Sequence, residues 1–249
     1  MILLIDAGNT RIKWAVSSDQ LDGITVSGVI DDDDWSELIA YVGKFESVWL
    51  SCVASEQVRN SILSKVESLF GLKAELATVT ASAAGMLNSY DDLARLGVDR
   101  WVAALGARSI FSQGDLIIID AGTAVTIDLV SAKNRFEGGA ILPGFAIMHD
   151  ALLGRTAGIQ SQLQMVDSVV GKNTRDCVNS GVQYGLLGAI ERVVAEMSTL
   201  VGASGGGAGA APKLLIMGGD AAEIVAGSKL DFELHSDMIF YGLMILSKT

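Results

Sequence analysis

Two stretches of the chain share one pattern, ILLIDAGNT at Ile2–Thr10 and LIIIDAGTA at Leu116–Ala124. In each stretch a run of aliphatic residues ends in Asp-Ala-Gly, and a threonine follows within two residues. The pattern is typical of a buried strand that ends at a carboxylate and turns tightly through glycine. Because one copy lies in each half of the chain, the repeat predicts two domains built on the same plan.

The residue types in these two turns favour phosphate binding. Gly8 and Gly122 let the backbone approach a ligand, and successive backbone N–H groups with a threonine hydroxyl can cradle phosphate oxygens. The carboxylates of Asp6 and Asp120 can orient a hydrated magnesium ion. A plain turn is the alternative for a single copy, but the repetition after two aliphatic runs favours a clamp for nucleotide phosphates.

Charge and composition exclude several classes of protein. The chain has 249 residues and a net charge of −11. Nucleic acids and anionic lipid surfaces are recognised by clusters of Lys and Arg, so the acidic balance argues against both as partners. With 50% hydrophobic residues the chain can build a large core, which excludes a disordered protein.

Other sequence features bear on the cellular compartment. The apolar N-terminal run meets Asp6 and lacks a basic flank, so it does not predict a signal peptide. No uncharged apolar run approaches the about 18 residues of a membrane span. Cys52 and Cys177 lack metal-binding spacing, so we expect two small buried side chains and neither a zinc site nor a disulfide framework. We therefore expect a cytoplasmic protein.

The periodicity of the first half predicts the order of a ribonuclease-H-like α/β domain. After the first motif we expect two strands, a helix, a strand and a second helix, at Arg11–Ser18, Gly23–Ile30, Ser36–Phe45, Ser47–Val53 and Glu56–Phe70.

The second half repeats this plan, with strands at Asp115–Ile119, Ala124–Ser131 and Arg135–Ala140, a long helix at Val182–Leu200 and a strand at Lys213–Met217. Between the halves, Tyr90–Phe111 is predicted as a loop followed by a helix. The boundary then falls at Gln113–Gly114 and gives domains of residues 1–113 and 114–249. The stretch Ala203–Ala211 is low in complexity and predicts a surface loop, to which we assign no function.

Five motifs in this order resemble those of type III pantothenate kinases, over nearly the whole chain. They are Asp6–Lys13 (DAGNTRIK), Gly97–Arg100 (GVDR), Asp120–Thr123 (DAGT), Gly138-Gly139 with Pro143-Gly144, and Gly218-Gly219-Asp220. The resemblance implies the fold of the actin-like and sugar-kinase superfamily, two ribonuclease-H-like domains around a nucleotide cleft.

The resemblance also implies the reaction and its partners. It points to ATP-dependent phosphorylation of pantothenate to 4′-phosphopantothenate, the first step of coenzyme A biosynthesis, with Mg²⁺ accompanying ATP, a monovalent cation (K⁺ or NH₄⁺), and a homodimer. One alternative is a kinase of the same superfamily for another small alcohol or acid. Another is a regulatory accessory factor of the same fold, although the intact Asp6, Asp99 and Asp120 favour catalysis.

By this resemblance the first motif binds ATP, with Asp6 organising magnesium through water and Lys13 approaching the phosphates. The implied ATP-binding residues are Asp6, Ala7, Gly8, Asn9, Thr10, Arg11, Ile12, Lys13 and, in the second motif, Thr123. Asp120 matches the position that binds the monovalent cation. An exposed strand lysine is the alternative interpretation of Lys13.

The Gly97–Arg100 motif resembles the catalytic part of the family site. Asp99 matches the general base that accepts the proton of the pantothenate hydroxyl, and a guanidinium fork at Arg100 suits the pantothenate carboxylate. The implied substrate-binding residues are Tyr90, Gly97, Val98, Asp99, Arg100 and Thr174. From the bare sequence, Asp-Arg at a helix start is more often a helix cap with a surface partner, and the family resemblance reverses this preference.

Tyr90 and Thr174 each have a structural alternative. Tyr90 matches a substrate-contacting tyrosine, and the family carries a proline three residues later, where this chain has Leu93. Packing of its ring is the alternative role of Tyr90. Thr174 matches a threonine that reaches pantothenate from the partner subunit, and the alternative for Thr174 is an N-cap of the helix that follows.

Overall fold

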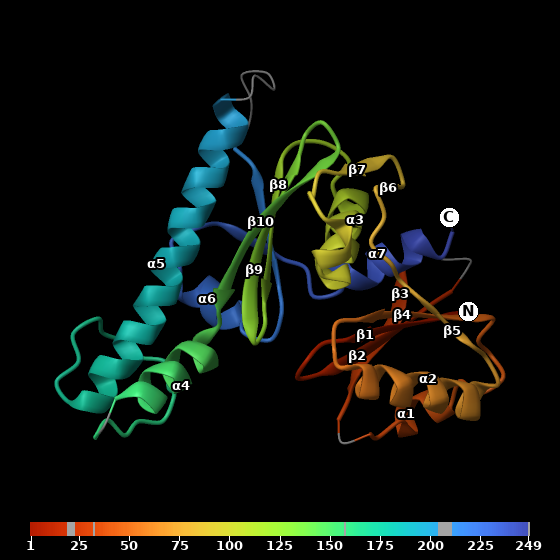
Figure 1. The fold of residues 1–249 in the computed structure, drawn as a ribbon, viewed down its shortest axis with the longest axis horizontal. Helices are drawn as coiled ribbons and strands as arrows, with labels where there is room; N and C mark the ends of the chain where they lie inside the picture. Colours follow the sequence, from red (N-terminus) through yellow and green to blue (C-terminus); the bar gives the residue numbers. More distant parts are fainter. Residues whose placement is uncertain (19–22, 32, 157, 204–210, 249) are drawn as a thin grey trace. The chain divides into compact units, whose positions relative to one another are not determined.

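The computed structural model describes residues 1–18, 23–31, 33–156, 158–203 and 211–248 (Figure 1). Most of the low-complexity stretch predicted as a surface loop, residues 204–210, lies outside the described residues. The chain forms two compact units. Unit 1 comprises Met1–Gln113, Lys133–Phe136 and Asp237–Thr249, and unit 2 comprises Gly114–Ala132 and Glu137–Ser236.

Unit 1 is built on a five-stranded sheet in the order β3-β2-β1-β4-β5 (Figure 1). Its strands are β1 (Ile2–Ala7), β2 (Ile12–Ser17), β3 (Ile24–Ile30), β4 (Ser47–Cys52) and β5 (Ala74–Leu76). The first three strands form an antiparallel meander, whereas β4 runs parallel to β1 and β5 runs parallel to β4. This is the strand order of the ribonuclease-H-like plan predicted for the first half.

The two faces of this sheet are covered by different helices. Leu3, Ile5 and Ala7 of β1 pack with buried residues of α1 (Ser36–Ile39) and α2 (Glu56–Phe70). Side chains alternate along a strand, so Leu4 and Asp6 point to the opposite face. On that face lie α3 (Val98–Ile110) and α7 (Met238–Leu246), which contact β4 and β1 (Figure 1).

Helices α3 and α7 approach each other closely at two glycines. A Cβ atom on Gly106 of α3 would collide with the Met238 carbonyl of α7, and one on Gly242 would collide with the Val102 carbonyl. The last helix of the chain is therefore a component of unit 1. Residues 1–113 and 114–249 were predicted as two continuous domains, and this packing explains why the observed unit 1 also takes in the C-terminal segment.

A small hairpin adds a second internal segment to unit 1. Strands β6 (Ser82–Ala83) and β7 (Met86–Asn88) pair antiparallel, and β7 pairs in parallel with Arg135 and Phe136. The ring of Phe136 meets Trp101 of α3 edge to face, with 6.0 Å between centroids. These contacts explain why residues 133–136 belong to unit 1.

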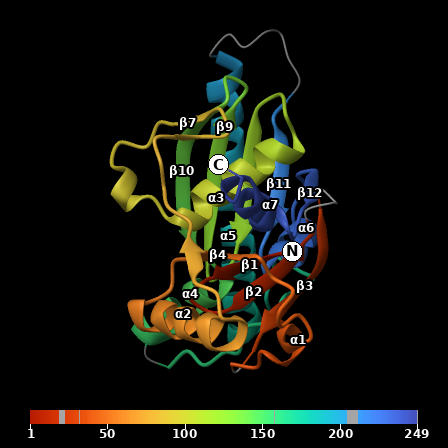
Figure 2. The ribbon, with the colours of Figure 1, turned by 90° about the vertical axis from the view of Figure 1, so that its right-hand side faces the viewer.

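Unit 2 repeats the plan of unit 1. Its strands are β8 (Leu116–Ala121), β9 (Ala124–Ser131), β10 (Arg135–Pro143, from Glu137 on), β11 (Lys213–Met217) and β12 (Phe232–Leu234). They lie in the order β10-β9-β8-β11-β12 within a seven-stranded sheet that β7 and β6 extend beyond β10 (Figure 2). Strand β9 is antiparallel to β8, whereas β11 and β12 run parallel to it. These five strands repeat the order of the first sheet, which confirms the predicted duplicated α/β fold.

Three helices accompany this second sheet, α4 (Phe145–Arg155), α5 (Thr174–Ala203) and α6 (Ala221–Gly227). Leu186 and Ile190 of α5 pack with Ile117 and Ile119 of β8 in the core of unit 2. Because α5 carries this apolar stripe along its length, it covers one face of the sheet (Figure 2).

Two predicted helices have different lengths in the structure. The helix predicted over Ser36–Phe45 is regular only over Ser36–Ile39, because Trp35 provides no side-chain cap and Gly43 adopts a left-handed φ of 75°. The long helix predicted from Val182 begins earlier, at Thr174, because the Asn173 side chain accepts a hydrogen bond from the Asp176 N–H. Helix α2 and strand β11 have the predicted bounds.

We expect Gly106→Ala to destabilise the protein, because the added methyl forces α3 and α7 apart. Overpacking of this kind costs about 1–3 kcal/mol, and a backbone carbonyl cannot move aside as a side chain can. Urea unfolding followed by tryptophan fluorescence measures the loss. Gly188→Ala in α5, where an added Cβ meets nothing within 4 Å, is the control and should be neutral or slightly stabilising. Equal midpoints for the two variants would contradict this account of the helix crossing.

Candidate active site

A row of polar residues crosses the sheet of unit 1 on the face that α3 and α7 cover. Asp6 of β1 lies opposite Lys13 of β2 and opposite Ser51 of β4 in the strand registers. Residues directly opposite each other on neighbouring strands project from the same face, so the three side chains form one row. Ser51 is fully buried within it.

The turn after β1 is tight and open to solvent. The Gly8 N–H donates to the Arg11 carbonyl at 3.0 Å, and Asn9, Thr10 and Arg11 are exposed. Backbone groups in such a turn are available to bind an anion. Two of the residues implied for ATP binding point elsewhere, since the side chains of Ala7 and Ile12 pack in the core beside α2. Their contribution to the loop is through the backbone.

Asp99 lies in the first turn of α3, directly after Gly97. Its Oδ1 accepts a hydrogen bond from the Arg100 N–H at 2.8 Å. A side chain at position 97 would approach this carboxylate, so glycine leaves room beside it. Burial raises the pKa of Asp99, and the Arg100 N–H and the Arg100 charge only partly oppose this shift. A carboxylate of raised basicity at a helix start fits a general base better than a surface cap.

Arg100 is buried and lies beside Tyr90. The guanidinium carbon is 5.7 Å from the centroid of the Tyr90 ring, a cation–π distance, and the side chain is almost inaccessible to solvent. The Tyr90 N–H donates to the Asn88 side chain at 3.0 Å, which holds the loop before α3. Leu93, at the family's proline position, begins a 3-10 turn, η1 (Leu93–Arg95). The structure thus brings Tyr90, Asp99 and Arg100 together.

Asp237 is a charged residue of this face that the sequence analysis missed. It precedes α7, and its carboxylate makes no hydrogen bond to the helix start. Burial raises the pKa of Asp237, and the positive charge of Lys13 opposes that shift. No local pattern marks Asp237, because its neighbours on the sheet are residues from the opposite end of the sequence. Ser51 was missed for the same reason.

In unit 2 the second Asp-Ala-Gly turn repeats the first. The Gly122 N–H donates to the Ala124 carbonyl at 3.1 Å, and Thr123 is exposed. Asp120 lies opposite Thr126 of β9 and Met217 of β11. The carboxylate position at the end of the first strand of each sheet is therefore equivalent in the two units.

The other glycine motifs of unit 2 gather around this turn. A Cβ on Gly144 would lie 2.7 Å or less from the Gly122 and Thr123 carbonyls, and one on Gly218 would collide with the backbone of Ala121. Gly139 is in equally close contact with Ile127 of β9. The Pro143-Gly144 and Gly218-Gly219 motifs thus converge on the end of β8, where the absence of a side chain lets Gly144 and Gly218 approach its backbone closely.

Thr174 is exposed at the start of α5 and is not its cap. The cap is Asn173, whose Oδ1 accepts from the Asp176 N–H at 2.9 Å. This finding removes the N-cap alternative for Thr174. The cysteines also differ from the expectation that both are buried: Cys52 is half-buried, and Cys177, in the same turn as Thr174, is exposed and donates from its Sγ to the Gly171 carbonyl.

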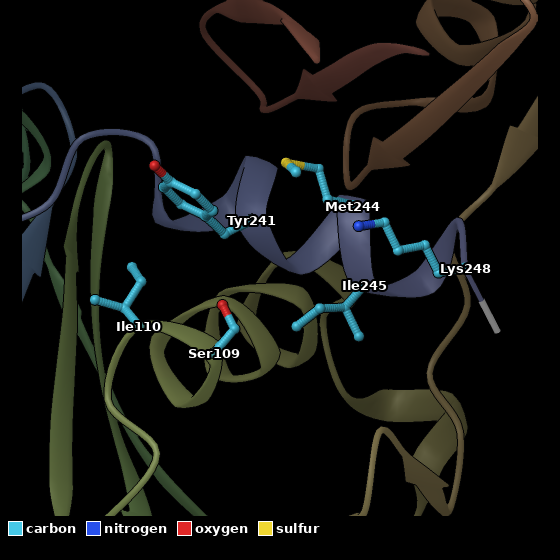
Figure 3. A pocket seen from close by; sticks show the side chains of 6 residues that line it. All are labelled: Ser109, Ile110, Tyr241, Met244, Ile245 and Lys248. Atoms are coloured by element: carbon cyan, nitrogen blue, oxygen red, sulfur yellow. The ribbon is translucent and has the colours of Figure 1, made fainter. Parts of the chain in front are cut away.

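A hollow of about 340 Å³ lies between the C-terminal end of α3 and the length of α7 (Figure 3). Its lining residues are Ser109, Ile110, Tyr241, Met244, Ile245 and Lys248. Asp99 begins α3, at the end opposite Ser109 and Ile110. The hollow therefore does not include Asp99.

An Asp-Ala-Gly turn follows β1 and β8 of the duplicated α/β fold, and a half-buried Asp99 with the buried Arg100 begins α3. Together these features are typical of a nucleotide-dependent kinase. The model of the type III pantothenate kinase family matches residues 2–196, so the chain belongs to that family. It is 34% identical to the type III pantothenate kinase of Methylibium petroleiphilum, over 99% of this chain and 98% of the relative. Identity to the type III pantothenate kinase of Aromatoleum aromaticum is 32%, over 100% and 98%.

Solved structures share the fold at lower identity. A Baf family transcriptional activator from Campylobacter jejuni aligns with a TM-score of 0.58 and 21% identity, over 99% of this chain and 98% of that one. The activator of 2-hydroxyisocaproyl-CoA dehydratase from Clostridium difficile aligns with a TM-score of 0.50 and 12% identity, over 98% and 93%. These likenesses concern the fold alone.

The raised pKa of Asp99 predicts a pH-dependent effect on stability. Folding favours the protonated form of the Asp99 carboxyl. The free energy of unfolding therefore falls as the pH rises from the ordinary pKa of an aspartate, about 3.9, through the raised pKa of Asp99. We therefore expect Asp99→Asn to unfold at an equal or higher temperature than the parent at pH 7, with the difference shrinking as the pH falls. Thermal unfolding over a pH series measures this, with the exposed Asp91→Asn as the control. A lower midpoint for Asp99→Asn at pH 7 would refute the argument.

Proposed function

We propose that Asp99 is the general base of this kinase and that Arg100 binds the carboxylate of its substrate. Membership of the type III pantothenate kinase family identifies the reaction, ATP-dependent phosphorylation of pantothenate to 4′-phosphopantothenate, which opens coenzyme A biosynthesis. The observation that carries the proposal is the convergence of Tyr90, Asp99 and Arg100 at the start of α3.

In the proposed step, the primary hydroxyl of pantothenate attacks the γ-phosphorus of ATP while its proton passes to the Asp99 carboxylate. The bond from the γ-phosphorus to the bridging oxygen breaks, and ADP leaves with that oxygen. Burial makes Asp99 a stronger base than an exposed aspartate, and the Arg100 N–H holds its Oδ1 in place. Tyr90 keeps the Arg100 guanidinium oriented through its ring. Gly97 and Val98 form the backbone beside the carboxylate.

We propose that the turn after β1 binds the ATP phosphates through Gly8, Asn9 and Thr10, with Lys13 on the adjacent sheet face. The kinase family implies ATP and a divalent metal. The residues present fit hydrated Mg²⁺: Asp6 supplies a carboxylate, and the buried Ser51 Oγ opposite it has no hydrogen-bond partner among the described residues. Bound Mg²⁺ would shield the phosphate charges. Asp6 and Ser51 would hold it, directly or through water.

For unit 2 we propose a monovalent cation at Asp120 and an ATP contact at Thr123. Monovalent and hard divalent cations prefer oxygen ligands. Supporting this, Gly144 packs against the carbonyls of Gly122 and Thr123, and Gly218 packs against the backbone of Ala121, so carbonyl oxygens lie at the end of β8 near Asp120. Potassium or ammonium would be the ion, as the sequence resemblance implies.

We also propose that the protein is a homodimer formed through unit 2. Unusually exposed apolar side chains lie on α4, on α5 and on the segment between them: Ile147, Leu152, Met165, Val169, Val170 and Tyr184. Hydrogen bonds from the Ser180 and Gln183 side chains to the Val169 and Val166 carbonyls hold that segment against α5. Several exposed apolar side chains on neighbouring segments favour a protein interface. Thr174 begins α5, one of the elements that carry these exposed side chains. This position supports the role proposed for Thr174, which is to contact the pantothenate bound by the partner subunit.

No helix of the described residues is long and apolar enough to cross a membrane. We also propose the cytoplasmic location expected from the sequence, because the reaction takes its phosphoryl group from ATP.

A coupled assay of ADP release, with ATP, Mg²⁺ and pantothenate, tests the proposed catalysis. We expect release to require pantothenate and to be faster in potassium than in sodium. Asp99→Asn should lose about 10²–10⁴-fold in turnover, the usual contribution of a general base. The control Asp91→Asn should retain turnover. Unchanged turnover in Asp99→Asn would refute its role as base, whereas a folded parent without turnover would favour the regulatory role or another small alcohol as substrate.

The dimer proposal predicts a mass twice that of the 26.1 kDa chain in sedimentation equilibrium. Val170→Lys, at a side chain 67% exposed, should shift the protein toward the monomer because it places a charge in the apolar surface. Leu234→Lys, at a side chain 55% exposed on β12, is the matched control and should leave the mass unchanged. A monomeric parent, or dissociation by both variants alike, would contradict this interface.

A further inference from the structure

Asp237 is a charged residue beside the candidate site with no role in the proposed mechanism. Its backbone carbonyl accepts hydrogen bonds from the N–H groups of Phe240 at 2.9 Å and Tyr241 at 3.2 Å, so its backbone is fixed as the start of α7. The residue is half-buried, and its carboxylate does not cap the helix. A buried carboxylate is costly unless it faces a positive charge or donors, so its surroundings indicate its role.

Lys13 lies on the sheet face beside which α7 begins. It projects from β2 on the face that α7 covers, and α7 contacts the neighbouring strand β1. Consistent with this placement, the Lys13 charge lowers the pKa of Asp237 against the effect of burial. Among the described residues, neither side chain forms a hydrogen bond or a close ion pair. The two charges therefore interact without direct contact.

Lys13 also lies beside a second carboxylate. Its register partner across the β1–β2 ladder is Asp6, the residue proposed to bind magnesium. A lysine between two carboxylates is drawn toward both, and a long, flexible side chain has many rotamers to choose from. A fixed negative charge at the start of α7 would draw the ammonium away from Asp6.

We propose that Asp237 is a positioning residue, whose carboxylate holds the Lys13 ammonium over the end of β1 and leaves Asp6 to the metal. This inference rests on the proposed role of Lys13 at the ATP phosphates. Partial burial strengthens the attraction between the two charges relative to water. A cation held in place before ATP arrives binds the phosphates without first losing side-chain freedom.

The competing explanation is that Asp237 merely begins α7. Asparagine caps helices about as well as aspartate but carries no charge. Asp237→Asn therefore keeps any capping function and removes the attraction to Lys13, whereas Asp237→Glu keeps the charge.

The experiment compares the KM for ATP and the KM for pantothenate in Asp237→Asn, Lys13→Met and the double variant. We expect Asp237→Asn to raise the KM for ATP about five- to tenfold, with little change for pantothenate and an unfolding temperature equal to or above that of the parent. In the Lys13→Met background the same substitution should have no further effect, because Asp237 acts through Lys13. Asp237→Glu should restore much of the ATP affinity.

Glu67→Gln is the matched control, since it removes one negative charge from α2 on the opposite face of the same sheet and should leave both KM values unchanged. The inference is overturned if Asp237→Asn matches this control, if its effect is equal in both backgrounds, or if it lowers the unfolding temperature and both affinities together. If Lys13→Met leaves the KM for ATP unchanged, the proposed role of Lys13 fails on its own.

Discussion

The contact between Gly106 and Gly242 is the constraint on which unit 1 depends. It brings the backbones of α3 and α7 closer than any side chain would permit, and the helix pair then covers one face of the β1–β4 sheet. Because Asp99 begins α3 and Asp237 begins α7, the same contact fixes the helices that carry these two carboxylates. The close approach depends on the absence of a side chain at both glycines.

The polar groups of unit 1 are partly buried in apolar surroundings, and this environment adjusts their chemistry. Burial raises the pKa of Asp99 and of Asp237, whereas nearby positive charge opposes the shift in each case. Charges in such surroundings interact more strongly than in water. The cost of burying them is offset by the apolar packing behind the sheet, where Leu3, Ile5 and Val66 are fully buried. The stability that such a core provides lets the site hold partly buried charged groups whose burial lowers the free energy of unfolding.

Local patterns in the sequence predicted the sheets well and the non-local contacts poorly. The aliphatic runs before Asp6 and Asp120 and the bounds of α2 and β11 follow from residues that are close in the chain, and these predictions were confirmed. The motif around Asp99 was likewise recognisable, although its role as base stays a prediction. Asp237 and Ser51 could not be predicted, because their neighbours come from distant segments. The start of α5 was missed because polar residues near Asn179 interrupt its apolar spacing.

Unit 1 is discontinuous, since its last helix follows the whole of unit 2 in the chain. During synthesis the chain emerges from its N-terminus, so β1–β5 and α3 exist before α7 has been made. Until then the face of α3 that receives Gly242 has no cover, and the start of α7 cannot lie beside Lys13. This face of unit 1 is thus completed only after α7 has been synthesised. A chain synthesised only through unit 2 would hold the turn after β1 but lack α7, so the order of translation delays the assembly of the proposed site until α7 exists.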